Sequence, residues 1–123
     1  MRPPAAWRRF YGAFLDWRAA GHLDNAIVRR LPGLFEASGL TDIRRVPHVS
    51  TVSAGQADFF RVAGMWRLAA DSRGRQMVAA GHLGEGEREV AVADYTEWMQ
   101  TPAASLTLHE ACVIGRRPGK SRR

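Results

Sequence analysis

SLTLHEACVIGRRP, residues 105–118, is the stretch that decides the fold. It is apolar at Leu106 and Leu108 and continuously so at residues 111–114, and Gly115 and Pro118 close it. An apolar run of this length between turn residues is typical of a strand inside a sheet, covered on both faces. Because two strands alone are marginally stable in water, the stretch also predicts further strands beside it.

A second strand is predicted at residues 41–52. Its apolar side chains are spaced along the run: Ile43, Val46, Val49 and Val52. Pro47 lies within it and cannot donate a ladder hydrogen bond, which predicts an edge position or a bulge. The sequence between the two strands is mostly helical in pattern, so the predicted order is helix, helix, strand, helices, strand.

The first helix is predicted at residues 5–20. Five aromatic side chains recur there at spacings of three and four: Trp7, Phe10, Tyr11, Phe14 and Trp17. This spacing places them on one face of an amphipathic helix, which Gly21 is expected to end. The face belongs either to the core or to the wall of a substrate pocket.

Four further helices are predicted. The second begins at a cap on Asp24 and stops at Gly39, with Pro32 expected to break or kink it. Residues 54–72 follow with an apolar face: Phe59, Val62, Met65, Trp66 and Ala69. A turn at residues 72–74 then precedes a short apolar helix at 75–81. Residues 85–100 are predicted as a helix with a buried line: Ala91, Tyr95 and Trp98.

Length and composition predict one globular domain. The chain has 123 residues, of which 46% are hydrophobic, and no run approaches the roughly 20 apolar residues of a membrane span. The single cysteine excludes an internal disulfide, and the N-terminus does not resemble a signal peptide. We therefore expect a cytoplasmic protein with no membrane partner.

The net charge of +6 is concentrated at the C-terminus, because five positive charges lie in the last eight residues. Residues 119–123 are expected to form a disordered basic tail, and non-specific nucleic-acid binding is the alternative. Residues 115–121 resemble a P-loop but have three rather than four residues between the glycines, and the chain ends before a helix could follow.

Reactive side chains are scattered. The four histidines show no metal spacing, so no metal site is predicted: His22, His48, His82 and His109. Cys112 is expected to be an inert thiol in the core, and no catalytic residue can be assigned. The densest polar cluster, at the start of the second helix, consists of four residues: His22, Asp24, Asn25 and Arg29. It either caps the helix or contacts a polar substrate group.

Several segments carry a resemblance to a known family. FLDWR at 14–18 and DNAIVRRLPGLFEASGLTDI at 24–43 resemble the late part of class I S-adenosylmethionine-dependent methyltransferases, where such a helix leads into the sixth strand. LHEACVIGRRP at 108–118 is similar to their seventh strand. The helical region between them is similar to the insertion that some small-molecule methyltransferases place there.

The resemblance implies that residues 1–118 are the C-terminal portion of a Rossmann-like class I methyltransferase fold, an α/β class with an antiparallel strand pair. In that fold the seventh strand lies between the fifth and sixth, so one edge of the last strand would be unpaired here, which invites pairing with another copy. The family's glycine-rich loop and ribose-binding acidic residue are absent. No cofactor-binding residue is carried over, and the chain alone is expected to bind S-adenosylmethionine weakly or not at all.

The implied function is the substrate-side part of a methyltransferase acting on a small molecule, in a truncated gene product or a domain fragment. Six residues are expected to shape the acceptor pocket: Phe14, Trp17, His22, Asn25, Arg29 and Trp66. Two other functions stay open, a small basic module that binds nucleic acid through its tail and a structural dimer formed through the open sheet edge.

Overall fold

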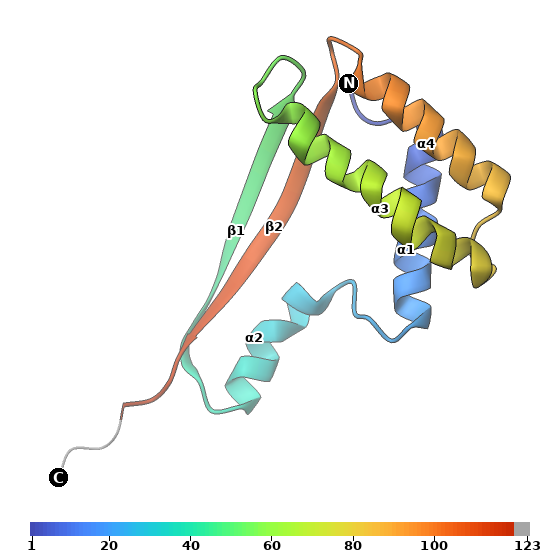
Figure 1. The fold of residues 1–123 in the computed structure, drawn as a ribbon. Coiled ribbons are helices and arrows are strands. Elements are labelled where there is room, and N and C mark those ends of the chain that lie inside the picture. Colours follow the sequence, from blue (N-terminus) through green and yellow to red (C-terminus); the bar gives the residue numbers. More distant parts are fainter. Residues whose placement is uncertain (120–123) are drawn as a thin grey trace. The chain divides into compact units, whose positions relative to one another are not determined.

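The structure is a computed structural model that describes residues 1–119 (Figure 1). Within them lie four helices and one antiparallel sheet of two strands, so the α/β class is confirmed. In chain order the elements are α1 (Ala5–Ala20), α2 (Ile27–Ala37), β1 (Thr41–Ser53), α3 (Phe59–Ala79), α4 (Glu85–Met99) and β2 (Ser105–Arg116). The predicted positions of α1, β1, α4 and β2 are confirmed. The predicted tail lies outside the described residues, apart from Gly119.

The chain folds as two compact units. Met1–Asn25 and Thr51–Thr107 form the first, which contains α1, α3 and α4 and is called the helical unit below. Ala26–Ser50 and residues 108–119 form the second, which contains α2 and most of both strands and is called the strand unit.

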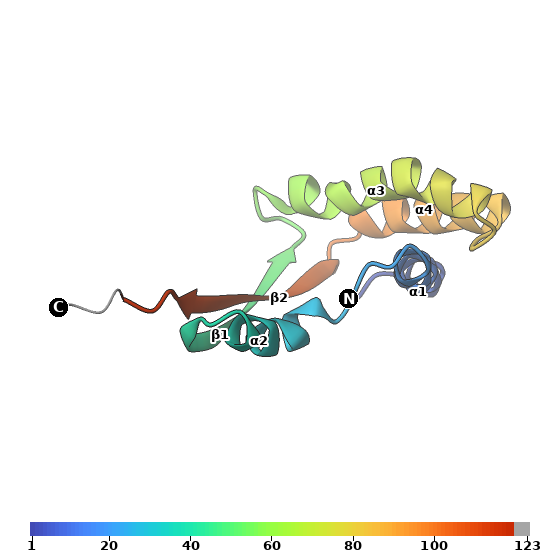
Figure 2. The ribbon, with the colours of Figure 1, turned by 90° about the horizontal axis from the view of Figure 1, so that it is seen from below.

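The core of the helical unit lies between its three helices. α1 packs beneath the α3–α4 pair, as Figure 2 shows. The largest fully buried side chains come from all three helices: Phe10, Phe59, Met77 and Tyr95. The ring of Trp7 stacks on that of Phe10 at 4.9 Å and lies 4.1 Å from that of Tyr95. The buried line predicted for α4 is confirmed, since Ala91, Tyr95 and Trp98 are all buried.

α3 is one continuous helix of 21 residues, so the turn predicted at residues 72–74 is wrong. Gly74 lies in its interior and is buried, where a Cβ atom would come within 3.1 Å of Arg88 Cδ and 3.2 Å of Phe10 Cε2. The glycine therefore permits close packing of neighbouring helices. Met65, predicted to face inward, is 61% exposed.

Three helices end in the same way. The residue after the cap has a left-handed backbone in each: His22 (φ 65°), Gly39 (φ 87°) and Gly81 (φ 81°). The next N–H donates to the carbonyl five residues earlier: Leu23 to Arg18, Leu40 to Phe35 and His82 to Met77. These are Schellman motifs, which satisfy the last carbonyls of each helix. Gly39 ends α2 as predicted, but at the end of α1 the left-handed residue is His22 and not Gly21, whose φ is −86°.

α2 differs from its prediction at two points. It begins at Ile27 with Ala26 at the N-cap position and no side-chain cap, so the cap predicted at Asp24 is wrong. Pro32 lies inside the helix, which continues without a break to Ala37. The loss of one backbone donor is tolerated here within a helix of 11 residues.

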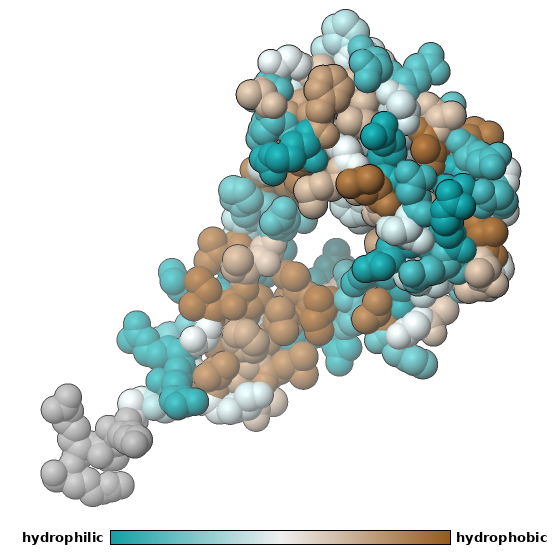
Figure 3. Space-filling view, in the orientation of Figure 1, coloured by the Kyte–Doolittle hydropathy of each residue, from teal (hydrophilic) through white to brown (hydrophobic). Residues whose placement is uncertain are grey.

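In the strand unit α2 lies against one face of the strands, where a Cβ atom on Gly115 would meet Phe35 Cδ2 at 3.0 Å. No described residue of this unit is buried. The prediction that β2 is covered on both faces is therefore wrong. The prediction that Cys112 is a thiol in the core is also wrong, since Cys112 is exposed. The physical reason is that the described sheet has two strands and one short covering helix. Figure 3 shows the resulting apolar patch over α2 and the strands beside it.

No helix of the described chain combines the length and the apolar composition that crossing a membrane requires.

Candidate functional site

A cluster of aromatic rings lies on the surface of the helical unit, and we call Tyr11, Phe14, Trp17 and Trp66 the aromatic cluster. Three of them share a face of α1 because they are spaced three residues apart, and α3 supplies the fourth. Trp66 meets the rings of Phe14 and Tyr11 edge to face, at 6.3 Å and 5.4 Å. The ring centres of Phe14 and Trp17 lie 6.0 Å apart. None of the four is fully buried, so the cluster offers ring surface to a ligand.

A cation lies beside these rings. The guanidinium carbon of Arg18 is 5.8 Å from the centre of the Phe14 ring, a cation–π distance. Arg18 Nε also donates to Asn25 Oδ1 at 3.0 Å, and Asn25 Nδ2 donates to the carbonyl of Leu15 at 2.8 Å. Asn25 therefore ties the loop that follows α1 back onto the helix and orients Arg18.

A depression of about 280 Å³ adjoins the cluster. Its lining comes from the ends of α1 and α3: Trp17, Arg18, Ala20, Gly21, Leu23, Ala80 and His82. Most of these side chains are apolar, while the guanidinium of Arg18 and the imidazole of His82 are polar. The arrangement suits a small planar molecule, which an aromatic ring can stack against and a guanidinium can orient through hydrogen bonds.

The six residues predicted for the acceptor pocket fall into three groups. Phe14, Trp17 and Trp66 come together in the aromatic cluster. Asn25 and His22 lie just after α1, where the first bonds to the helix and the second forms its left-handed cap. Arg29 is exposed on α2 and belongs to the strand unit.

Sequence reasoning missed three residues of this region as site residues. Tyr11 and Arg18 carried a usable signal, because they share α1 with Phe14 and Trp17. No sequence signal indicated His82. It lines the depression because the chain turns there at the cap of α3, and the end of this helix was predicted only approximately.

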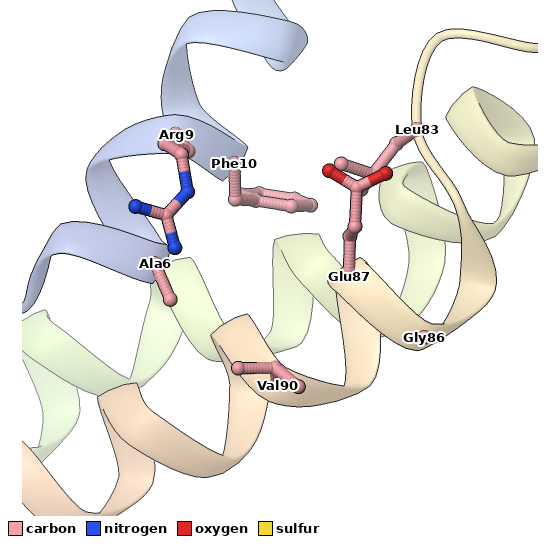
Figure 4. Close-up of a pocket in the computed structure, with 7 residues that line it drawn as sticks. All are labelled: Ala6, Arg9, Phe10, Leu83, Gly86, Glu87 and Val90. Carbon is pink, nitrogen blue, oxygen red and sulfur yellow. The ribbon is translucent and has the colours of Figure 1, made fainter.

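A second depression, of about 320 Å³, lies between α1 and α4. In Figure 4 Arg9 and Glu87 stand on opposite sides with the ring of Phe10 between them. Glu87 Oε1 accepts a hydrogen bond from the N–H of Gly84 at 3.2 Å, so this carboxylate caps α4. The other lining residues are aliphatic or glycine: Ala6, Leu83, Gly86 and Val90. The one carboxylate in the lining, that of Glu87, is engaged in this cap, so the depression is a weaker candidate for a reactive site.

The strand unit carries the excess charge. The sequence of segments 26–50 and 108–123 contains nine basic and three acidic residues, whereas segments 1–25 and 51–107 contain nine of each. A depression of about 680 Å³ lies between the ends of the strands and includes three arginines: Arg44, Arg116 and Arg117. Arg116 Nη1 lies 3.7 Å from Asp42 Oδ2, and because both are largely exposed this pair contributes little stability.

Buried polar groups of the helical unit have structural partners. Arg88 is the single buried charged residue of the described chain. Its Nε donates to Glu85 Oε2 at 2.9 Å, its Nη2 bonds Glu85 Oε1, and its Nη1 lies 3.5 Å from Asp71 Oδ1. The hydrogen bonds from Arg88 lower the pKa of Glu85, and the same bonds raise the pKa of Arg88. These contacts join α3 to α4, so Arg88 and Glu85 have a structural role.

The described residues contain no group of three or more histidine, cysteine or acidic side chains able to hold a metal ion. In the comparisons with known proteins, no family model, no curated protein and no solved structure matches the chain.

Proposed function

We propose that this chain forms the acceptor-binding side of an S-adenosylmethionine-dependent methyltransferase that acts on a small molecule. In this proposal β1 and β2 correspond to strands six and seven of a Rossmann-like class I fold. The aromatic cluster binds the acceptor, with Arg18 and His82 as polar contacts beside Trp17.

Two observations support the proposal. The sequence resemblance at residues 24–43 and 108–118 covers α2, the first three residues of β1 and most of β2, and β1 and β2 pair antiparallel as strands six and seven do. The observation that carries the acceptor site is the meeting of Phe14, Trp17 and Trp66, which were singled out from sequence positions on two different helices.

The chain's own residues do not fit the cofactor. The resemblance would require a glycine-rich loop after the first strand and an acidic residue at the end of the second. Near the strand ends, Gly39 and Gly55 have left-handed backbones, and a Cβ atom on Gly115 would meet Phe35 Cδ2 at 3.0 Å. We therefore derive no methyl-transfer step through this chain. What its residues would supply is placement of the acceptor, which by itself contributes substantially to such reactions.

NMR titration with catechol as the probe tests the acceptor site. We expect saturable shifts of the indole N–H signals of Trp17 and Trp66, with a dissociation constant of about 1 mM or tighter. Trp66→Ala should weaken binding about three- to tenfold, because it removes one edge-to-face ring partner. Phe60→Ala is the matched control, since Phe60 is an exposed α3 aromatic outside the cluster. Equal binding by both variants, or none by the unmodified chain, contradicts the proposal.

Calorimetric titration with S-adenosylmethionine tests the cofactor part. We expect no measurable affinity for the chain alone. Micromolar affinity would show that this chain does hold the cofactor and would overturn the division of roles proposed here.

Anion binding is a second candidate function, favoured by the nine basic and three acidic residues in the sequence of segments 26–50 and 108–123. Nucleic acid bound in this way would be held through phosphate contacts and released by salt. A gel-shift series at rising salt should show weaker binding for a chain that ends at Arg117 than for the full chain. Binding that survives the deletion unchanged would exclude the tail as the contact.

A further inference from the structure

We propose that two copies of this chain associate through the outer edges of their β2 strands and form one continuous antiparallel sheet. This inference does not rest on the proposed function, because it follows from the edges, burial and charges of the strand unit alone. The occupant of the edge is a second copy.

The outer edge of β2 is open. Within the described chain the sheet has the order β1–β2, so β2 pairs with β1 alone along its 12 residues. On its other side the N–H of Ser105 donates to the carbonyl of Met1 at 3.0 Å, and the residues that follow Ser105 have no strand partner in the described chain. A long edge of this kind is a template for pairing with another strand.

The two edges of the sheet differ in protection. β1 contains Pro47 and the charged residues Arg44 and Arg45, features that discourage pairing at an edge. In β2, residues 108–115 contain no proline and one charged residue, Glu110. The unprotected edge is therefore that of β2.

The strand unit also lacks a covered core. None of its described residues is buried, and Ile114 is 44% exposed. A two-stranded sheet with one helix is marginal in water, whereas additional strands make such a sheet stable. Pairing of two β2 strands would make one sheet of four strands.

The register inside one copy determines which groups face outward. Ala54 donates to the carbonyl of Ala104 at 2.9 Å, and the same offset joins Thr51 to Thr107 and Asp42 to Arg116. Bonded and non-bonded pairs alternate along an antiparallel ladder, so the odd-numbered residues of β2 direct their N–H groups away from β1. Pro47 occupies the corresponding outward position of β1, where no donor is needed.

Two copies related by a two-fold axis can therefore pair about an odd-numbered residue of β2. With the axis at Val113, that residue faces itself and Ala111 faces Gly115 of the second copy. Glu110 then lies opposite Arg116 of the second copy, once on each side of the axis. Within β2 itself, an axis at any other residue between Ala111 and Gly115 brings no opposite charges together, so charge complementarity selects Val113.

In this register each Arg116 lies between Asp42 of its own chain, 3.7 Å away, and Glu110 of the second copy. Two such triads flank the apolar centre of the interface. The excess positive charge of the strand units opposes association at low salt. At physiological ionic strength, repulsion between charges more than about 8 Å apart is largely screened, while the attraction between Arg116 and the adjacent Glu110 and Asp42 is less affected.

Sedimentation velocity of the full chain at physiological ionic strength tests the proposal. We expect a monomer–dimer equilibrium over about 1–100 µM, the range in which interfaces of modest size associate. Glu110→Arg and Arg116→Glu should each weaken dimerisation at least about tenfold, because each places like charges opposite at two positions. An equimolar mixture of the two variants should dimerise again, since both heterodimer pairs are attractive.

A strand-edge pair of variants separates backbone pairing from charge. Ala111→Pro removes an outward N–H of β2 and should abolish the dimer, whereas Val49→Pro, at an outward position of β1, should leave it intact. The thermal transition of the helical unit, followed by circular dichroism, reports whether each variant is folded. A monomer at all concentrations, or a dimer that neither charge variant weakens, overturns the proposal.

Discussion

The hydroxyl of Tyr95 on α4 donates a hydrogen bond of 2.6 Å to the carbonyl oxygen of Ala63 on α3, and both residues are fully buried. This bond lies in the centre of the helical unit and joins two helices that pack side by side. Burial without a charged neighbour raises the pKa of Tyr95 above its ordinary value. The contact thus helps to fix the packing of Tyr95, and its burial favours the protonated hydroxyl.

Tyr95→Phe should lower the free energy of unfolding by about 1 kcal/mol, because one buried hydrogen bond is lost while the ring packing is kept. Urea unfolding followed by circular dichroism measures this. Tyr11→Phe is the matched control, since Tyr11 is 39% exposed and its loss of a hydroxyl should change stability by less than about 0.5 kcal/mol. A loss of equal size in both variants would contradict the role of the Ala63 contact.

The pH dependence of stability should also depend on Tyr95. Its pKa is higher in the folded chain than the value of about 10 in the unfolded chain, so its stabilising contribution is complete below pH of about 10. Above that pH the unfolded chain loses the proton first, and stability falls. Unfolding curves measured between pH 8 and 11 should show this decline in the unmodified protein and a smaller decline in Tyr95→Phe.

His22→Gly should stabilise the protein by about 1 kcal/mol. His22 has a φ of 65°, a left-handed conformation that glycine adopts without steric cost. Gly39→Ala should have the opposite effect, because Gly39 has a φ of 87° at the end of α2. Thermal melts compare the two with Gly21→Ala, where φ is −86° and little change is expected. If His22→Gly is destabilising, the imidazole makes a contact that outweighs its backbone strain.

Two glycines of α3 should respond in opposite directions to substitution. Gly74→Val should cost about 2 kcal/mol, because Arg88 and Phe10 already lie 3.1 Å and 3.2 Å from a Cβ position there. Gly64→Ala should stabilise by about 0.5–1 kcal/mol, since its Cβ would meet Met99 Cε at an ordinary 3.7 Å and alanine favours the helix. Chemical denaturation of both variants checks the contrast, and a stabilising Gly74→Val would contradict the close packing.

The sequence predicted those features that local periodicity determines. The spacing of Ala91, Tyr95 and Trp98 specifies the buried side of α4, and the rings of α1 follow from the same rule. The role of Gly74 could not be predicted, because a glycine inside a helical pattern indicates either a turn or close packing. The side chains that decide between them, Arg88 and Phe10, approach it only in the folded chain.

The strand unit and the candidate site show a similar limit. An apolar run such as β2 predicts a strand but does not specify how many elements cover it, so the exposure of Cys112 was not foreseen. For the site, spacing along α1 relates Phe14 to Trp17. Trp66 joins them only because α3 packs on α1, which spacing along one helix does not predict. The left-handed backbone of His22 comes from the cap of α1, and no sequence pattern indicates it.

The uneven placement of charge has a practical consequence for handling this protein. Because the helical unit has as many acidic as basic residues, retention on a cation-exchange resin depends on the strand unit alone. The protein should adsorb to glass, mica or a sulfonated matrix through its strand unit. Immobilised in that way, it would keep the aromatic cluster free of direct electrostatic attachment, which suits surface-based measurements of small-molecule binding.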